Sequence, residues 1–378
     1  MSEFDEIAHS GGKVNFSVEA LPDGRRGIRL SFEHTRGNPV AVYGVYALPP
    51  NIPIEEYNFT GIGPGSSSPS IPTSVPVFIV SDIERKFGHK CPDCKEYWRA
   101  DSHVHYCPYC GSYGQPHQFL SDAQRKYIRH YIERWDSLQD LDVGQSACIN
   151  LDEISDATLK NLKKPEFYIS DQRQQTTFKC CACDEEHDIL GRFGHCSFCF
   201  TRNDSDILRN VAIAEMRQSL DSGTSPDSVL KLAVSAFENC LRRYRDVLLK
   251  HVSLTPRRLD LAQKIGLRKI ESIDAVFGTI FDIQLVKAVK IEHTQQFNKM
   301  LSRRHVYEHN GGMVDQKYID DTNDSTVKVG QLIFENRQDV HQFISQIAAV
   351  CDALHVGVHT ILKPDKQAIA LRKGGRDL

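Results

Sequence analysis

The pattern of apolar and polar residues divides the chain into a β-rich start, an irregular middle and a helical end. Residues 13–20 (KVNFSVEA) and 27–34 (GIRLSFEH) alternate apolar and polar side chains, as half-buried strands do. The Pro-Asp-Gly sequence at 22–24 predicts a turn that joins them in a β-hairpin. Residues 40–48 (VAVYGVYAL) predict a third strand. We therefore expect a small β unit at the start of the chain.

A helical spacing of apolar residues dominates from about residue 205 onward. It is clear in 226–252, where Val229, Ala233, Phe237 and Cys240 recur every three or four positions. The same spacing predicts helices over 205–221, 257–266, 270–286, 289–308 and 336–362. One short strand is predicted at 327–334 (VKVGQLIF). This part of the chain is therefore expected to be a bundle of helices.

The middle of the chain, from about residue 87 to 204, is rich in cysteine. Within it, residues 121–138 predict a helix that is capped by Ser121. Before it, residues 61–76 are rich in Gly, Ser and Pro, which favours a linker. This segment lacks the Gly-Lys-Ser/Thr ending that a phosphate-binding P-loop needs.

Eight of the twelve cysteines form two matched sets. Each set has the form C-x2-C-x12-C-x2-C, and the eight residues are Cys91, Cys94, Cys107, Cys110, Cys180, Cys183, Cys196 and Cys199. Each C-x-x-C turn directs two sulfurs to one point, so two turns complete a tetrahedron of thiolates around Zn²⁺. A redox C-x-x-C normally occurs once, at the start of a helix. The repeat therefore predicts two zinc ribbons with one structural Zn²⁺ each.

Cys181 adjoins Cys180 and is an alternative ligand, but only Cys180 keeps the two-residue spacing to Cys183. Five histidines flank the cysteine turns, and with four cysteines in each set none of them is needed as a ligand: His89, His103, His105, His187 and His195. Four thiolates leave no open coordination position for catalysis, so the ribbons are expected to build structure or to dock a partner or nucleic acid. Paired cysteines that hold metal rather than form disulfides indicate a cytoplasmic protein.

Composition and charge narrow the possibilities further. The chain has 378 residues, of which 40% are hydrophobic, and a formal net charge of −3, which predicts two or three domains with real cores. Because the chain as a whole is not a polycation, binding of nucleic acid would require a local basic cleft. Two basic segments, LRRYR (241–245) and PRRL (256–259), are candidates for such a path. The chain contains no stretch of about 18 apolar residues, so no membrane span is predicted. The polar start MSEFDEIAHSGG is unlike a signal peptide.

The segment SRRHVYEHNGG, residues 302–312, carries two conflicting patterns. The first is H-x-x-E-H, in which His305 and His309 share one helix face and Glu308 is the general base of a zinc peptidase. Such a site needs a third protein ligand, and the only glutamate after Glu308 is Glu335. Two neighbouring arginines would also add positive charge beside a dication. The peptidase is therefore the weaker interpretation.

The second pattern is an arginine followed five residues later by a histidine. Arg304 has the bidentate donors that hold a phosphate, and His309 lies at the helix end, because Asn310-Gly311-Gly312 stops the helix. A helix C-terminus favours imidazolium, which suits a proton donor. Together they supply charge stabilisation and proton transfer without a metal. A guanidinium and an imidazole are the groups needed to cleave RNA through attack by its own 2′-hydroxyl.

These residues resemble the HEPN superfamily, because Arg304-His305-x3-His309 matches its R-x4-H motif. The sequences NGGMVDQKYI and VKVGQLI and the long terminal helix are also similar to HEPN domains of the prokaryotic defence type. The resemblance covers roughly residues 205–362. It implies a helical bundle that forms a homodimer, in which two copies of the motif share one cleft and cleave RNA without a catalytic metal.

The resemblance also implies roles for the residues. Arg304 would bind the scissile phosphate, His309 would be the acid/base group, and His305 would orient the others or touch RNA. Arg303, one step off the motif, would contact only backbone phosphate. The implied activity is that of an endoribonuclease in antiviral defence or toxin-like RNA cleavage. The alternative is a non-catalytic regulator that binds nucleic acid or protein, and the zinc peptidase is the third interpretation.

The predicted fold class is multidomain α+β. Residues 1–80 form the β-rich unit with its linker, and 81–204 form a double zinc-ribbon module with an intervening helix. Residues 205–365 form the all-α bundle of HEPN type, and 366–378 form a basic tail.

Overall fold

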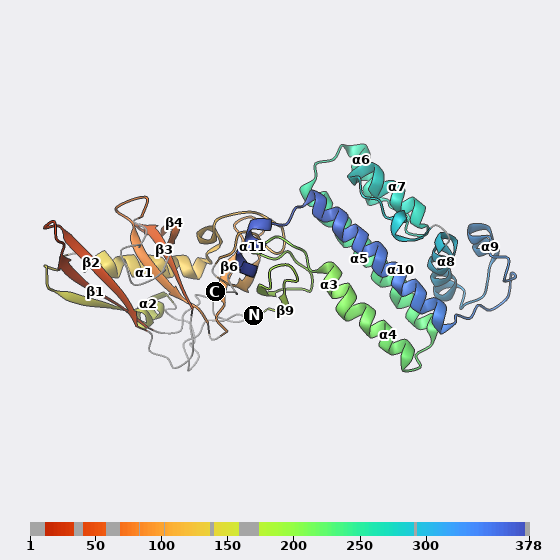
Figure 1. The fold of residues 1–378 in the computed structure, drawn as a ribbon, viewed down its shortest axis with the longest axis horizontal. Helices are drawn as coiled ribbons and strands as arrows, with labels where there is room; N and C mark the ends of the chain where they lie inside the picture. Colours follow the sequence, from red (N-terminus) through yellow and green to blue (C-terminus); the bar gives the residue numbers. More distant parts are fainter. Residues whose placement is uncertain are drawn as a thin grey trace. The chain divides into compact units, whose positions relative to one another are not determined.

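The computed structural model describes residues 12–33, 41–57, 69–82, 84–101, 103–136, 140–158, 174–290 and 293–374. The chain separates into two compact units (Figure 1). Unit 1 comprises residues 1–200 together with 365–378, and unit 2 comprises residues 201–364. Unit 2 is therefore inserted between two parts of unit 1. Of the predicted linker 61–76, residues 61–68 lie outside the described residues.

The predicted β-hairpin is confirmed, and it belongs to a three-stranded sheet. Strands β1 (Lys13–Ala20) and β2 (Arg26–Glu33) pair antiparallel, with Val18 opposite Ile28. Strand β8 (Ser146–Asn150) pairs with the other edge of β1. The sheet is thus completed by a strand more than a hundred residues further along the chain.

The third predicted strand is present but lies in a second sheet. Strand β3 (Val42–Leu48) pairs with β4 (Ile52–Tyr57) and β5 (Val75–Val80). Helix α1 (Asp122–Asp136) and helix α2 (Leu151–Thr158) share one hydrophobic core with both sheets. Ser121 caps α1 as predicted, because its Oγ accepts from the N–H of Gln124 at 3.2 Å. The N-terminal β unit therefore extends beyond residue 80, since α1, β8 and α2 complete its core.

The two cysteine-rich segments contribute to one four-stranded sheet, in the order β6-β7-β10-β9. The first segment provides β6 (Phe87–Lys90) and β7 (Tyr97–Ala100), and the second provides β9 (Thr176–Lys179) and β10 (Glu186–Ile189). Arg99 of β7 lies opposite Asp188 of β10. Its fully buried guanidinium donates to Asp188 at 2.8 Å and to Asp82 at 3.0 Å. This buried ion pair ties the two segments into a single module.

The sequence predicted a basic tail for 366–378, of which residues 366–374 form a helix and residues 375–378 lie outside the described residues. Helix α11 (Lys366–Gly374) packs Ala368 and Ile369 against the second set of cysteines. The N–H of Asp365 donates to the carbonyl of Cys199 at 2.9 Å. Arg372 forms ion pairs with Asp101 at 2.9 Å and Glu185 at 3.0 Å. The basic residues near the end are thus partly used to hold this helix on unit 1.

Unit 2 is helical, as predicted. Its helices are α3 (Asp204–Ile207), a π-helical segment (Leu208–Ile213), α4 (Ala214–Asp221), α5 (Pro226–His251), α6 (Pro256–Gln263), α7 (Ile270–Phe281), α8 (Thr294–His309), α9 (Gln316–Thr322) and α10 (Arg337–Ile361). Helices α5 and α10 lie side by side and run in the same direction (Figure 1). Their apolar faces, with those of α4, α7 and α8, form one large core.

Two details of unit 2 differ from the sequence pattern. The helix predicted over 270–286 ends at Phe281, where Asp282 adopts a left-handed φ of 57°. The strand predicted at 327–334 is reduced to one bridge between Met313 and Leu332, and helix α9 was not predicted. Both errors lie in short segments, where local side-chain bonds outweigh periodicity.

Helix α10 is long and apolar enough to cross a membrane by length and composition alone. One side of it is nevertheless buried in the core of unit 2, through Val340, Phe343, Ile344, Ile347, Val350, Cys351, Leu354 and Val358. Length and composition alone do not distinguish a membrane span from the core helix of a bundle, which is the place that α10 has in unit 2.

Candidate functional site

The eight predicted zinc ligands gather into two clusters of four. In the first cluster the sulfurs of Cys91 and Cys110 are 3.6 Å apart, as are those of Cys94 and Cys107. The second cluster has 3.6 Å between Cys180 and Cys199 and 3.5 Å between Cys183 and Cys196. Thiolates at about 2.3 Å from a tetrahedral Zn²⁺ lie about 3.8 Å apart. Both clusters therefore fit one Zn²⁺ each.

All four C-x-x-C turns have the same backbone geometry. In each turn the residue after the second cysteine has a left-handed φ, between 63° and 76° (Lys95, Gly111, Asp184 and Phe200). Its N–H donates to the carbonyl of the first cysteine, at distances from 2.9 to 3.1 Å. The sulfur of Cys91 also accepts the N–H of Asp93 at 3.4 Å, and that of Cys196 accepts the N–H of Phe198 at 3.4 Å. Backbone donors that converge on sulfur stabilise a thiolate, so the turns are built to bind metal.

Histidines support the clusters rather than replace cysteines. The buried imidazole of His187 lies with Nε2 3.2 Å from the sulfur of Cys196 and Nδ1 2.9 Å from the hydroxyl of Ser197. A ring N–H that donates to a metal-binding thiolate, with its orientation fixed by a third group, is a common feature of metal sites. Cys180 is buried in the second cluster, whereas Cys181 is exposed and outside it.

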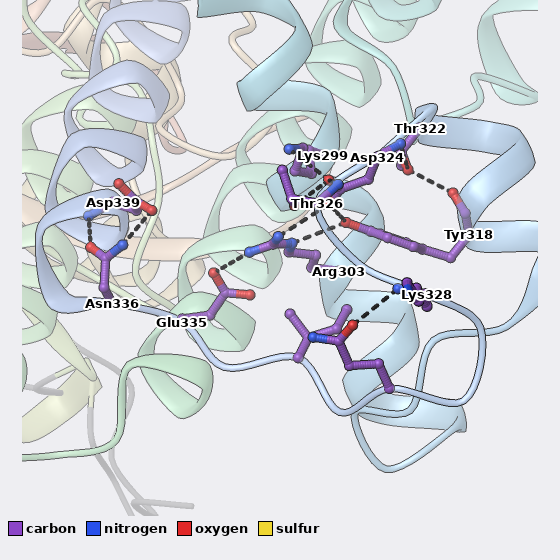
Figure 2. A network of polar contacts seen from close by, with 12 residues as sticks. Lys299, Arg303, Tyr318, Thr322, Asp324, Thr326, Lys328, Glu335, Asn336 and Asp339 are labelled. Atoms are coloured by element: carbon purple, nitrogen blue, oxygen red, sulfur yellow. Dashed lines mark hydrogen bonds and ion pairs between the residues drawn. The ribbon is translucent and has the colours of Figure 1, made fainter.

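Helix α8 carries the arginine-histidine motif, and its first arginine is structural. Arg303 is buried and donates to Tyr318 at 3.0 Å, to Glu335 at 2.9 Å and to Asp324 at 3.2 Å (Figure 2). The Tyr318 hydroxyl also donates to Asp324, at 2.7 Å. This network fastens α8 to α9 and to the segment before α10. The prediction that Arg303 contacts backbone phosphate is therefore wrong, because the guanidinium is used inside the protein.

Arg304 has a different environment from Arg303. Its side chain keeps 26% of its exposure and forms an ion pair with Glu308, with Nε 2.9 Å from the carboxylate. A second carboxylate, that of Glu238 on α5, lies 3.8 Å from Nη1. Arg304 is thus accessible to solvent, but its charge is partly compensated in this structure.

The two histidines of the motif contact each other at the end of α8, with ring centroids 4.4 Å apart and ring planes tilted by 53°. Within the described residues, neither imidazole has a hydrogen-bond partner, and His309 is exposed. Burial lowers the pKa of His305, and the positive charges of His309, Arg268 and Lys317 lower it further. His305 is therefore a neutral imidazole at neutral pH, which can accept a proton. The helix ends at Asn310 as predicted, with Gly311 in the left-handed region at φ 59°.

Arg304 and His305 line a pocket of about 250 Å³ between α5, α8, α9 and the loop that joins α6 to α7. Three further cations line it, namely Arg242, Arg268 and Lys317, together with the carboxylates Glu238, Asp315 and Asp321. His309 does not line the pocket, but its ring contacts that of His305, which does. Of the two basic segments noted in the sequence, LRRYR contributes Arg242, whereas PRRL contributes nothing to the pocket lining.

The peptidase interpretation lacks its third ligand. The carboxylate of Glu335 accepts from Arg303 at 2.9 Å and from the Tyr307 hydroxyl at 2.9 Å, so both oxygens are occupied. Glu308 is paired with Arg304. Within the described part of the chain, the groups with metal-binding spacing are the two cysteine clusters.

Sequence reasoning missed several residues that shape these sites. Arg99 lies in a short strand, and nothing in its local sequence indicates that its carboxylate partners include one from a distant segment. His187 was recognised as a neighbour of the cysteine turns, but its contacts with Cys196 and Ser197 were not predicted. Arg268 and Lys317 were missed because the pocket forms from four separate elements. The basic character of 241–245 was the one signal that pointed to Arg242.

The chain was compared with protein families, curated proteins and solved structures, and no family model, curated protein or solved structure matches it.

Proposed function

We propose that unit 2 is a metal-independent endoribonuclease whose active site is the pocket on α8. The observation that supports this most strongly is the convergence of Arg304 and His305 in one cationic pocket, with the ring of His309 in contact with that of His305. An arginine supplies bidentate donors to a phosphate, and two imidazoles supply an acid and a base.

The proposed reaction is an attack by the ribose 2′-oxygen on the adjacent phosphorus. Neutral His305 accepts the proton of the 2′-hydroxyl as the new oxygen–phosphorus bond forms. His309, at the C-terminal end of α8, donates a proton to the 5′-oxygen as its bond to phosphorus breaks. Arg304 stabilises the negative charge that develops on the phosphoryl oxygens. The products are a 2′,3′-cyclic phosphate and a 5′-hydroxyl.

The proposal includes a homodimer in which two copies of the motif meet. Three exposed apolar side chains support it: Met313 lies between α8 and α9, and Leu332 and Phe334 lie between α9 and α10. Met313 and Leu332 are joined by a β-bridge and are 49% and 51% exposed, and Phe334 is 81% exposed. Contiguous exposed apolar side chains indicate a surface that binds another protein.

A second function is favoured by the ion pairs of Arg304. Because Glu308 and Glu238 compensate its charge, a phosphate has to compete with two carboxylates. A regulator that binds nucleic acid or protein without cutting is therefore the alternative. Under that alternative the zinc-ribbon module would be the principal binding surface.

The experiment is a cleavage assay with a fluorescent oligoribonucleotide in buffer that contains a chelator. Arg304→Ala removes the phosphate ligand, and we expect it to lower the rate by about 10²–10³-fold. His305→Ala and His309→Ala should lower it by a similar factor, because each removes a proton-transfer group. The matched control is Arg258→Ala, which removes an exposed arginine of α6 that does not line the pocket.

Sedimentation of each variant checks that the oligomeric state is unchanged. RNA binding without cleavage by the wild-type protein, unaffected by Arg304→Ala, would establish the non-catalytic alternative. A rate that falls equally in the Arg258→Ala control would also contradict the proposed site.

A further inference from the structure

A second cavity adjoins the pocket of Arg304. It measures about 260 Å³ and lies where the loop between α6 and α7 meets α8. The two cavities share four lining residues, namely Leu267, Arg268, Ser302 and Asp321. They are therefore two parts of one continuous groove.

The groove has the opposite charge to the chain. Its lining includes five cations (Arg242, Arg268, Lys269, Arg304 and Lys317) against three carboxylates (Glu238, Asp315 and Asp321), whereas the whole chain has a net charge of −3. The second cavity contributes Lys269 to this excess. Within the described residues Lys269 has no ion-pair partner, and Arg268 lies 3.8 Å from the nearest carboxylate oxygen, that of Asp321.

The second cavity also offers neutral hydrogen-bond donors. The hydroxyls of Ser272 and Ser302 line it, and neither has a hydrogen-bond partner within the described part of the chain. Ser302 lies on α8 two residues before Arg304. Cationic side chains with nearby hydroxyl donors are the groups that proteins use to hold nucleic-acid phosphates.

We propose that this second cavity is a subsite for the phosphate next to the scissile one, with Lys269 as its principal ligand. The inference rests on the proposed ribonuclease function and specifies its substrate. Arg268, which lines both cavities, lies between the two phosphates. The substrate class is then a polynucleotide with at least two consecutive phosphodiesters, rather than a mononucleotide or a cyclic nucleotide.

The test measures binding of two probes that cannot be cleaved. One is a short 2′-O-methyl oligonucleotide, and the other is a 2′-O-methyl dinucleotide with a single phosphodiester. Lys269→Gln should weaken binding of the longer probe about fivefold to tenfold and leave the dinucleotide unchanged. It should also lower the slope of log Kd against log salt concentration by about 0.7, the value for one lost contact with single-stranded phosphate.

The matched control is Lys264→Gln. Lys264 is an exposed lysine of the same loop, is paired with Asp260 at 2.7 Å and does not line the cavity. Circular dichroism checks that both variants are folded. Equal effects of the two variants, or a Lys269→Gln effect on the dinucleotide as well, would overturn the subsite.

This experiment separates the subsite from the proposed function. A wild-type protein that binds the longer probe but cuts no RNA contradicts the ribonuclease, while Lys269→Gln still decides whether the subsite exists. A wild-type protein that cuts RNA with an unchanged rate and affinity in Lys269→Gln contradicts the subsite alone. Failure of the wild type to bind either probe overturns both.

Discussion

Two adjacent arginines on α8 have opposite roles, although the sequence presents them alike. Arg303 is buried and bound to three partners, while Arg304 lines a solvent-filled pocket with two carboxylates nearby. One residue along a helix is a rotation of about 100°, which carries a side chain from the core face to the open face. The R-x4-H spacing therefore selects Arg304, the arginine on the open face, because its register relative to His309 is fixed.

Replacement of Arg303 should destabilise unit 2. Arg303→Met leaves the carboxylate of Glu335 without a cation and that of Asp324 with Lys299 alone, in a largely buried network. Breaking a buried ion pair on one side costs about 3–5 kcal/mol. Arg304→Met, the matched control, should cost less than about 1 kcal/mol, because its ion pairs are partly exposed. Urea unfolding followed by circular dichroism measures both, and equal losses would contradict the assigned roles.

At the scale of the elements, two half-buried histidines of α10 lie at the end of unit 2 where α10 runs parallel to α5. The Tyr244 hydroxyl on α5 contacts Nδ1 of His355 on α10 at 2.6 Å. The N–H of Arg202 donates to Nε2 of His359 at 3.2 Å. These contacts give the i, i+4 pair of His355 and His359 a packing role between the two helices and the start of unit 2.

The stability of unit 2 should depend on pH through these histidines. Burial lowers the pKa of His359 from 6.5 to about 4, and burial lowers the pKa of His355 as well. The unfolded chain therefore binds more protons than the folded unit between these values. Stability is full above pH 6.5 and falls as the pH falls toward 4, by about 3 kcal/mol for His359.

The comparison variant is His359→Gln, which keeps an acceptor for the N–H of Arg202 but does not titrate. Its free energy of unfolding should change less between neutral and acidic pH than that of the wild type. If urea titrations show the same pH dependence of the free energy of unfolding in His359→Gln and in the wild type, His359 does not contribute to that dependence.

The elements that the sequence predicted well are those with long periodic patterns or exact spacing. The hairpin of β1 and β2, the long helices α5 and α10, and the cysteine clusters all follow from local residues alone. The elements that it missed depend on distant partners. Strand β8 pairs with β1 from far along the chain, and α11 is fixed by ion pairs to Asp101 and Glu185. The second cavity was missed for the same reason, since its lining comes from α7, α8, α9 and a loop.

At the scale of the whole molecule, the two cysteine clusters, each of which fits one Zn²⁺, lie in a module with short strands. The four strands of its sheet are four residues long, and α11 packs directly on the second cluster. A full Zn²⁺ site supplies on the order of 10 kcal/mol of folding free energy. Metal binding is therefore expected to determine whether this part of unit 1 folds.

Metal analysis should find about two Zn²⁺ per chain, one for each cluster. Cys180→Ser should reduce this to about one, because it removes a ligand of the second cluster, while Cys181→Ser should leave it at two. Hydrogen exchange should then show loss of protection in β9, β10 and α11 for Cys180→Ser, with β6 and β7 less affected. Retention of both metals in Cys180→Ser would contradict the ligand assignment.

The proposed ribonuclease activity is tested most directly with a DNA oligonucleotide that contains a single ribonucleotide. The products are identified by mass spectrometry. We expect the wild-type protein to make one cut, directly after the ribonucleotide, with a 2′,3′-cyclic phosphate on one fragment and a 5′-hydroxyl on the other. Arg304→Ala should abolish this cut. Cleavage at deoxyribose positions, or the same product from Arg304→Ala, would contradict it.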